Sequence, residues 1–244
     1  MDHSGYDAYA LVVEADGRRL MCTGDLRGHG RKSRLFEQML NSPPAAIDTL
    51  LLQETHVPAA AEEPAPMATE RQIELELAQT FQATAGLPVA LSSAQNNDRL
   101  VTVYRAARRA SRTLLVDLYT ASVAQATGRA SIPQPGFPGL GVYVPVKQRV
   151  RVKESGEFHR THDVRDVRVF PEQLAAEPSR YVLLTGSSTV PERLRAGALS
   201  NGVAIWSMWS GYLPEASGLR LQAQTERGRR AARGAPHLRA RLPR

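Results

Sequence analysis

The chain has a single cysteine, Cys22, in 244 residues. One thiol excludes a disulfide framework and a cysteine-based zinc cage. Because Cys22 follows Leu20 and Met21, we expect it to be a buried, inert thiol. The sequence also lacks an apolar run long enough to span a bilayer, and its first residues lack the charged-then-apolar order of a signal peptide. We therefore expect a cytoplasmic protein with no membrane partner.

Acidic side chains are scarce in residues 219–244, which hold eight arginines and one glutamate. This segment accounts for the whole formal net charge of +7, since the rest of the chain has 23 basic and 23 acidic residues. The charge balance therefore gives no reason to expect that the folded body binds nucleic acid. Apolar periodicity stops after Gly218, so the sequence predicts a basic, disordered tail over 219–244.

The first part of the chain has the pattern of a hairpin, a helix and one more strand. Residues 9–14 and 20–23 flank a turn, which predicts an antiparallel pair. A helix is expected from Ser33, followed by an apolar strand over 47–52 of the kind that is covered on both faces. These elements assign residues 1–57 to one segment of a sheet.

The composition changes after a stretch of proline, alanine and glutamate, so residues 58–68 are interpreted as a linker. Beyond it, short apolar strands alternate with amphipathic helices, which favours parallel βαβ units with right-handed crossovers. The fold class is therefore α/β, with a Rossmann-like domain over 69–218. The expected strands are 88–91, 113–116, 181–184 and 203–206, and the expected helices are 69–84, 96–110, 119–126 and 191–199.

The run from Thr23 to Lys32 follows the predicted hairpin and leads into the predicted helix. Asp25 is thus placed just after the end of a strand, where α/β enzymes often keep their chemistry. His3 lies one hairpin earlier. An imidazole and a carboxylate are ligands that a borderline metal ion such as zinc accepts.

Several short stretches resemble one family in order and in spacing. Asp2-His3-Ser4 and Thr23-Gly24-Asp25 resemble two of its metal motifs, and Leu51 to Thr55 resembles the strand end that opens its inserted domain. The body of that inserted domain is resembled by the stretches 96–100, 116–120 and 204–212. The family is the β-CASP branch of the metallo-β-lactamase fold, RNA-processing exonucleases related to ribonuclease J.

This resemblance implies a partial metallo-β-lactamase-fold sheet followed by a β-CASP domain. It implies that Asp25 bridges two zinc ions, that His3 supplies an imidazole nitrogen, and that Asp25 and Glu54 are the catalytic acids. The substrate class implied is RNA or single-stranded nucleic acid, cleaved by a zinc-activated water.

The chain also departs from the family pattern. The main ligand motif, His-x-His-x-Asp-His, belongs upstream of His3, and the later His-Thr-Ser-Gly-His-Ala segment is missing. Residues 236–243 can be coded so that the neighbouring reading frame gives His-Thr-Ser-Gly-His-Ala-Ser. We therefore expect an N-terminally truncated and C-terminally frameshifted chain. Because two ligands cannot fix a tetrahedral zinc ion, we predict weak or no zinc binding and no turnover by this chain alone.

Two other functions stay open: a non-catalytic remnant that binds RNA or a partner subunit, and a small-molecule metallohydrolase. The sequence does not decide between exonuclease and endonuclease action, and an oligomeric state stays possible.

Several further residues have two possible interpretations each. The loop 28–32 either cradles a phosphate or is a shaped turn, and His29 is a structural histidine rather than a ligand. We expect three histidines on the surface: His56, His159 and His162. The side chains of Trp206 and Trp209 either pack under the sheet or stack on a base. A basic helix face, either solvated or in contact with RNA, is formed by Arg105, Arg108, Arg109 and Arg112.

Overall fold

The computed structural model describes residues 1–53, 67–186, 201–208 and 239–241. The chain divides into two compact units, Met1–Ile73 and Glu74–Arg244. The division falls within helix α2 (Glu70–Ala83), C-terminal to the stretch interpreted as a linker. In the described residues no helix is both long and apolar enough to cross a membrane.

Unit 1 is built on the predicted hairpin. Strand β1 (Leu11–Ala15) pairs antiparallel with β2 (Arg18–Cys22), and β3 (Thr49–Leu51) adds to β2 in parallel. The two turn residues Asp16 and Gly17 both have positive φ, as the tight turn of a two-residue hairpin requires. Helix α1 (Ser33–Asn41) connects β2 to β3. The predicted hairpin, helix and strand are therefore confirmed.

The surface of unit 1 differs from the expectation for the strand over 47–52. That strand was expected to be covered on both faces, yet all three residues of β3 are exposed, and so are all five residues of β1. Met21 is the one buried apolar side chain among the described residues of this unit. Cys22 is partly exposed, so the expected burial of its thiol is also wrong. An apolar sequence shows that burial of a strand would be favourable, but it does not show whether another segment packs against that strand.

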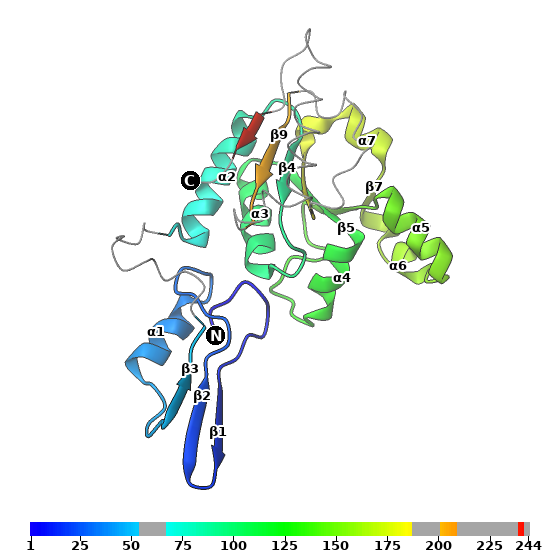
Figure 1. Cartoon of the computed structure of the whole chain (residues 1–244). Helices are drawn as coiled ribbons and strands as arrows, with labels where there is room; N and C mark the ends of the chain where they lie inside the picture. Colours follow the sequence, from blue (N-terminus) through cyan, green and yellow to red (C-terminus); the bar gives the residue numbers. More distant parts are fainter. Residues whose placement is uncertain (54–66, 187–200, 209–238, 242–244) are drawn as a thin grey trace. The chain divides into compact units, whose positions relative to one another are not determined.

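Unit 2 is a parallel α/β layer, and the predicted α/β fold class is thus confirmed. The seven strands among its described residues pair in parallel throughout, in the order β10-β9-β4-β8-β5-β6-β7. Figure 1 shows β4, β5 and β9 within this sheet and the helices α5 and α6 beside β7. The strands are β4 (Pro88–Leu91), β5 (Thr113–Asp117), β6 (Leu140–Tyr143), β7 (Arg168–Val169), β8 (Tyr181–Thr185), β9 (Val203–Trp206) and β10 (Arg239–Arg241).

From β4 to β8, at least one helix lies between each strand and the next along the chain, as crossovers between parallel strands require. The first of these helices, α3, begins at the predicted cap, where Asn96 accepts a hydrogen bond from the Arg99 backbone at 2.9 Å. The helices are α3 (Asn97–Arg109), α4 (Leu118–Ala126), α5 (Val146–Ser155), α6 (His159–His162) and α7 (Pro171–Ala176), with short 3-10 turns at Arg165–Val167 and Pro178–Arg180.

The core of unit 2 lies between the sheet and its helices. Leu91, Leu115 and Leu183, on three neighbouring strands, are completely buried, and Trp206 is packed with them. Of the two readings for Trp206, packing is therefore the one that the structure supports, while Trp209 lies outside the described residues. The predicted helix at 191–199 also lies outside them.

Arg239–Arg241 is the described part of the segment expected to be a disordered tail. Instead of lacking structure, these three residues pair in parallel with β9 at the edge of the sheet. An edge strand presents unpaired backbone groups, which explains why a segment without apolar periodicity can still add to it.

Candidate metal centre

The two residues expected to bind metal lie next to each other in unit 1. His3 Nε2 is 3.5 Å from Asp25 Oδ2, and the two side chains are 32% and 53% exposed. His3 precedes β1 and Asp25 follows β2, so the hairpin brings the two segments together. The third candidate, Glu54, lies outside the described residues, as does His56.

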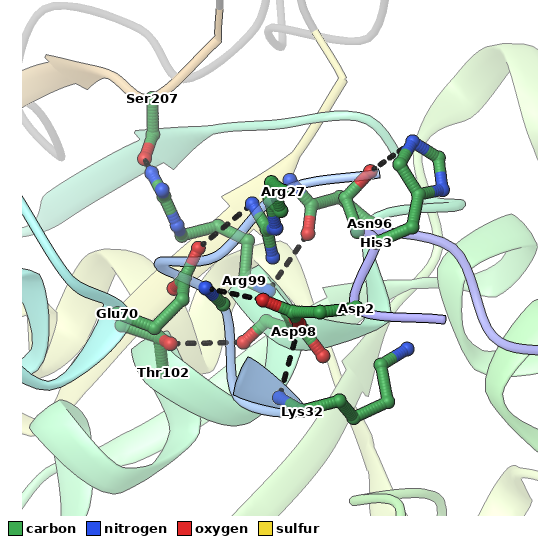
Figure 2. A network of polar contacts seen from close by, with 12 residues as sticks. Asp2, His3, Arg27, Lys32, Glu70, Asn96, Asp98, Arg99, Thr102 and Ser207 are labelled. Atoms are coloured by element: carbon green, nitrogen blue, oxygen red, sulfur yellow. Dashed lines mark hydrogen bonds and ion pairs between the residues drawn. The ribbon is translucent and has the colours of Figure 1, made fainter. Parts of the chain in front are cut away.

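The loop after Asp25 holds the residue that precedes His3. The carboxylate of Asp2 is completely buried and accepts hydrogen bonds from the backbone N–H groups of Gly30 at 2.7 Å and Lys32 at 3.0 Å (Figure 2). The Arg27 backbone N–H also donates to the Asp2 carbonyl at 2.8 Å. Of the two readings for residues 28–32, an anion cradle is thus present, but the anion that it holds is a carboxylate of this chain.

A second contact fixes the other side of His3. The Lys32 ammonium donates to the Gly5 carbonyl at 3.0 Å, and the Gly5 N–H donates to His3 Nδ1 at 3.2 Å. Because Nδ1 accepts a hydrogen bond, the proton of the neutral ring belongs on Nε2, which faces Asp25. The imidazole is therefore oriented from both ends.

The same loop is tied to the start of α2. Arg27 lies 3.6 Å from the buried carboxylate of Glu70 (Figure 2). The Glu70 N–H donates to the His29 carbonyl at 3.1 Å. His29 thus contributes a backbone carbonyl to this loop, and the structural role expected for its imidazole stays a prediction. Ionic and backbone contacts hold the loop, and the ring of Phe36 lies against Gly28.

The geometry can be compared with what zinc requires. Two ligand atoms about 2.0–2.1 Å from zinc at the tetrahedral angle lie about 3.3–3.4 Å apart. The 3.5 Å between His3 Nε2 and Asp25 Oδ2 is close to that separation. One neutral imidazole and one carboxylate also suit zinc in kind. In the part of the chain that the structure describes, however, no group of three His, Cys, Asp or Glu side chains gathers to hold a metal ion.

Asp2 and Gly30 are the residues that sequence reasoning missed at this site. A Cβ placed on Gly30 would lie 2.2 Å from Asp2 Oδ1, so only glycine fits beside the buried carboxylate. The signals were present in the sequence: an aspartate directly before His3 and two glycines two positions apart in the loop. The role of these residues depends on the directions of the backbone N–H groups in the loop, which the periodicity of the sequence does not predict.

The remaining candidates are spread over unit 2. His159 and His162 are exposed on α6, as predicted, with His162 Nδ1 3.8 Å from Asp163. The expected basic helix face is partly wrong. Arg112 is buried and donates to the carbonyls of Thr84, Gly86 and Tyr181, and burial lowers the pKa of its guanidinium. Arg109 binds the carboxylate of Glu74 at 2.8 Å.

Comparison with known proteins adds evidence on the fold alone. No protein-family model matches the sequence, and no curated protein matches it. Among solved structures, the chain is similar to the crystal structure of a protein of unknown function from Enterococcus faecalis V583, with a TM-score of 0.67 and 13% sequence identity. The match covers 99% of this chain and 50% of that chain, so this chain spans half the length of that protein. At this identity the likeness supports the α/β architecture and carries no function.

Proposed function

We propose that this chain is part of a metal-dependent hydrolase resembling the β-CASP ribonucleases, with RNA phosphodiesters as its substrate class. The observation that carries the proposal is the 3.5 Å separation of His3 Nε2 and Asp25 Oδ2, since the family resemblance requires these two atoms to share a metal centre. The expected place of action is the cytoplasm, in keeping with the single cysteine.

In this proposal His3 and Asp25 are the two groups of this chain that hold zinc. When bound, zinc lowers the pKa of a water and stabilises negative charge at phosphorus. Without metal, the Nε2–H group faces Asp25, while Gly5 and Lys32 fix the opposite side of the ring. To hold zinc, the ring would carry its proton on Nδ1 instead, and the contact from the Gly5 N–H would open. Glu54 is proposed as a further acid that orients the centre.

Zinc titration tests this assignment. We expect zinc to shift the imidazole proton resonances of His3 in the NMR spectrum, with an affinity well below that of a four-ligand site, because only two ligands are supplied. Asp25→Asn changes one of the two ligands and should weaken this binding by at least about tenfold, since disturbing even the partner of a metal ligand costs that much.

The control is Asp163→Asn, which removes a carboxylate beside His162 on the exposed helix α6 and should leave the His3 titration unchanged. His3→Ala identifies the His3 signals. If zinc leaves these signals unshifted, or if Asp25→Asn binds zinc as the unaltered chain does, the assignment fails. Tight stoichiometric uptake would instead contradict the expectation that two ligands bind weakly.

A second candidate function is a non-catalytic protein that binds RNA. The specific observation in its favour is a set of exposed cations on α5 that make no ion pair among the described residues. RNA binding without cleavage, in the presence of zinc or manganese, would favour this candidate over the hydrolase.

A further inference from the structure

Helix α5 presents an unusual run of positive charge. Four cations alternate along its middle, all four are exposed, and within the described residues none has an acidic partner. Residues two apart lie on opposite sides of an α-helix, so Arg149 and Lys153, four apart, share one face. The neighbouring segment differs, because there Arg160 binds Glu157 and Arg165 binds Asp166. The four cations of α5 are Lys147, Arg149, Arg151 and Lys153.

An aromatic side chain with a stacked guanidinium lies at the end of β7. The Arg168 guanidinium carbon is 4.7 Å from the centre of the Phe170 ring, and Phe170 is 47% exposed. An exposed ring is available to a planar ligand, and the guanidinium over it adds a positive charge at the same place. The pair therefore offers both a π-face and a positive charge.

The topology brings these two features to one edge of the sheet. β6 and β7 are parallel neighbours, with Tyr143 opposite Val169, so α5 begins just beyond the carboxyl end of one strand and Phe170 follows that of the next. Carboxyl ends of parallel strands are where α/β sheets bind ligands. Figure 1 shows α5 beside β7.

The positive charge of Arg149 on α5 acts on a residue of each of these two strands, Tyr143 of β6 and Arg168 of β7. Burial, and secondly the positive charge of Arg149, lower the pKa of Arg168. Burial raises the pKa of Tyr143, while Arg149 acts in the opposite direction and Glu172 adds to the rise. Two guanidinium groups that repel each other beside an exposed ring are stabilised by an anion placed between them.

We propose that this α5–β7 surface, made of Arg149 and Lys153 on one face of α5 together with Arg168 and Phe170, binds single-stranded RNA. Arg149 and Arg168 contact backbone phosphates, and Phe170 stacks on a base. Cations that follow the backbone combined with an aromatic platform are the features with which proteins bind single strands without reading sequence. The proposal deepens the nucleic-acid part of the proposed function and does not depend on the metal centre.

Fluorescence anisotropy with a fluorescein-labelled oligouridylate, recorded in EDTA, tests the surface. Arg149→Ala/Arg168→Ala should weaken binding and reduce the slope of log affinity against log salt by about 1.4, since each lost phosphate contact on a single strand contributes about 0.7. Phe170→Ala should weaken binding by roughly tenfold at all salt concentrations, with the salt slope unchanged. Phe170→Tyr should keep the affinity.

The matched control removes the same charge elsewhere. Arg71→Ala/Arg105→Ala takes two exposed arginines away from other helix positions and should change neither affinity nor slope beyond a small general effect. Equal losses in both double variants would overturn the proposal, as would RNA binding that survives Arg149→Ala/Arg168→Ala. Binding to phosphatidylserine vesicles but not to RNA would also overturn it. Because EDTA removes metal, failure here is distinguishable from failure of the zinc titration.

Discussion

Replacing Arg112 with methionine should lower the free energy of unfolding of the chain by about 3 kcal/mol. The buried guanidinium donates to the Gly86 carbonyl at 2.9 Å and the Tyr181 carbonyl at 3.3 Å, and it also binds the Thr84 carbonyl. Methionine fills similar space but leaves these carbonyls without donors. Each unsatisfied buried acceptor costs about 1–3 kcal/mol. Urea unfolding followed by circular dichroism measures the change.

The matched control is Arg105→Met, the same exchange at an exposed position of α3. Surface exchanges of this kind usually change stability by less than about 0.5 kcal/mol. Arg112→Lys should lie between the two, because an ammonium reaches fewer carbonyls than a guanidinium. An Arg112→Met chain as stable as the Arg105→Met chain would show that solvent replaces the guanidinium and that its three contacts contribute little.

Arg112 also shows where the sequence pattern ceases to be informative. Helical spacing groups it with Arg105, Arg108 and Arg109 on one face, but α3 ends at Arg109. Ser111 then adopts a φ of +55°, and the chain turns inward. A period of 3.6 residues predicts direction only while the helix lasts, so a side chain expected in solvent is in the interior.

The elements that repeat a local pattern were predictable. The hairpin at Leu11–Cys22 and the alternation of strands and helices after Glu70 follow from periods that each segment carries alone. The segments that pack against a strand cannot be predicted from the sequence of that strand alone. The apolar run over 47–52 predicts burial, yet Leu50 is 56% exposed, because burial depends on which other segments lie against it.

The candidate site divides in the same way. His3 and Asp25 could be proposed because a family resemblance names their types and spacing, and the structure places them 3.5 Å apart. The hydrogen bonds to the Asp2 carboxylate could not be predicted, because their donors are the backbone N–H groups of Gly30 and Lys32. The directions of these groups are set by the folded loop. Side chains with reactive groups can be identified from the sequence more readily than the backbone groups that position them.

Gly30→Ala should have the largest effect on this loop. The new methyl group would lie 2.2 Å from one Asp2 oxygen and 2.7 Å from the other and from Arg27 Nε, far inside van der Waals contact. The buried carboxylate must move and loses charge-assisted hydrogen bonds, each worth about 1.5–3 kcal/mol. We therefore expect a loss of roughly 3 kcal/mol in the local opening free energy of residues 27–32, measured by amide hydrogen exchange. His3 should lose its fixed position beside Asp25.

Gly17→Ala is a control that distinguishes steric overlap from the cost of a positive φ. Gly17 has a φ of +71°, and a methyl group added to it would meet nothing within 4 Å. Alanine there costs only the left-handed conformation, about 1–2 kcal/mol, and should leave exchange in residues 27–32 unchanged. Gly30 has no positive φ in the structure, so its substitution tests the contact with Asp2 alone.

A double-mutant cycle completes the test of Gly30. In Asp2→Ala/Gly30→Ala the methyl group no longer meets a carboxylate, and the second substitution should then cost much less than it does beside Asp2. Additive losses in this cycle would show that Gly30 is required for some reason other than the carboxylate, and that Asp2 does not hold His3 through this loop.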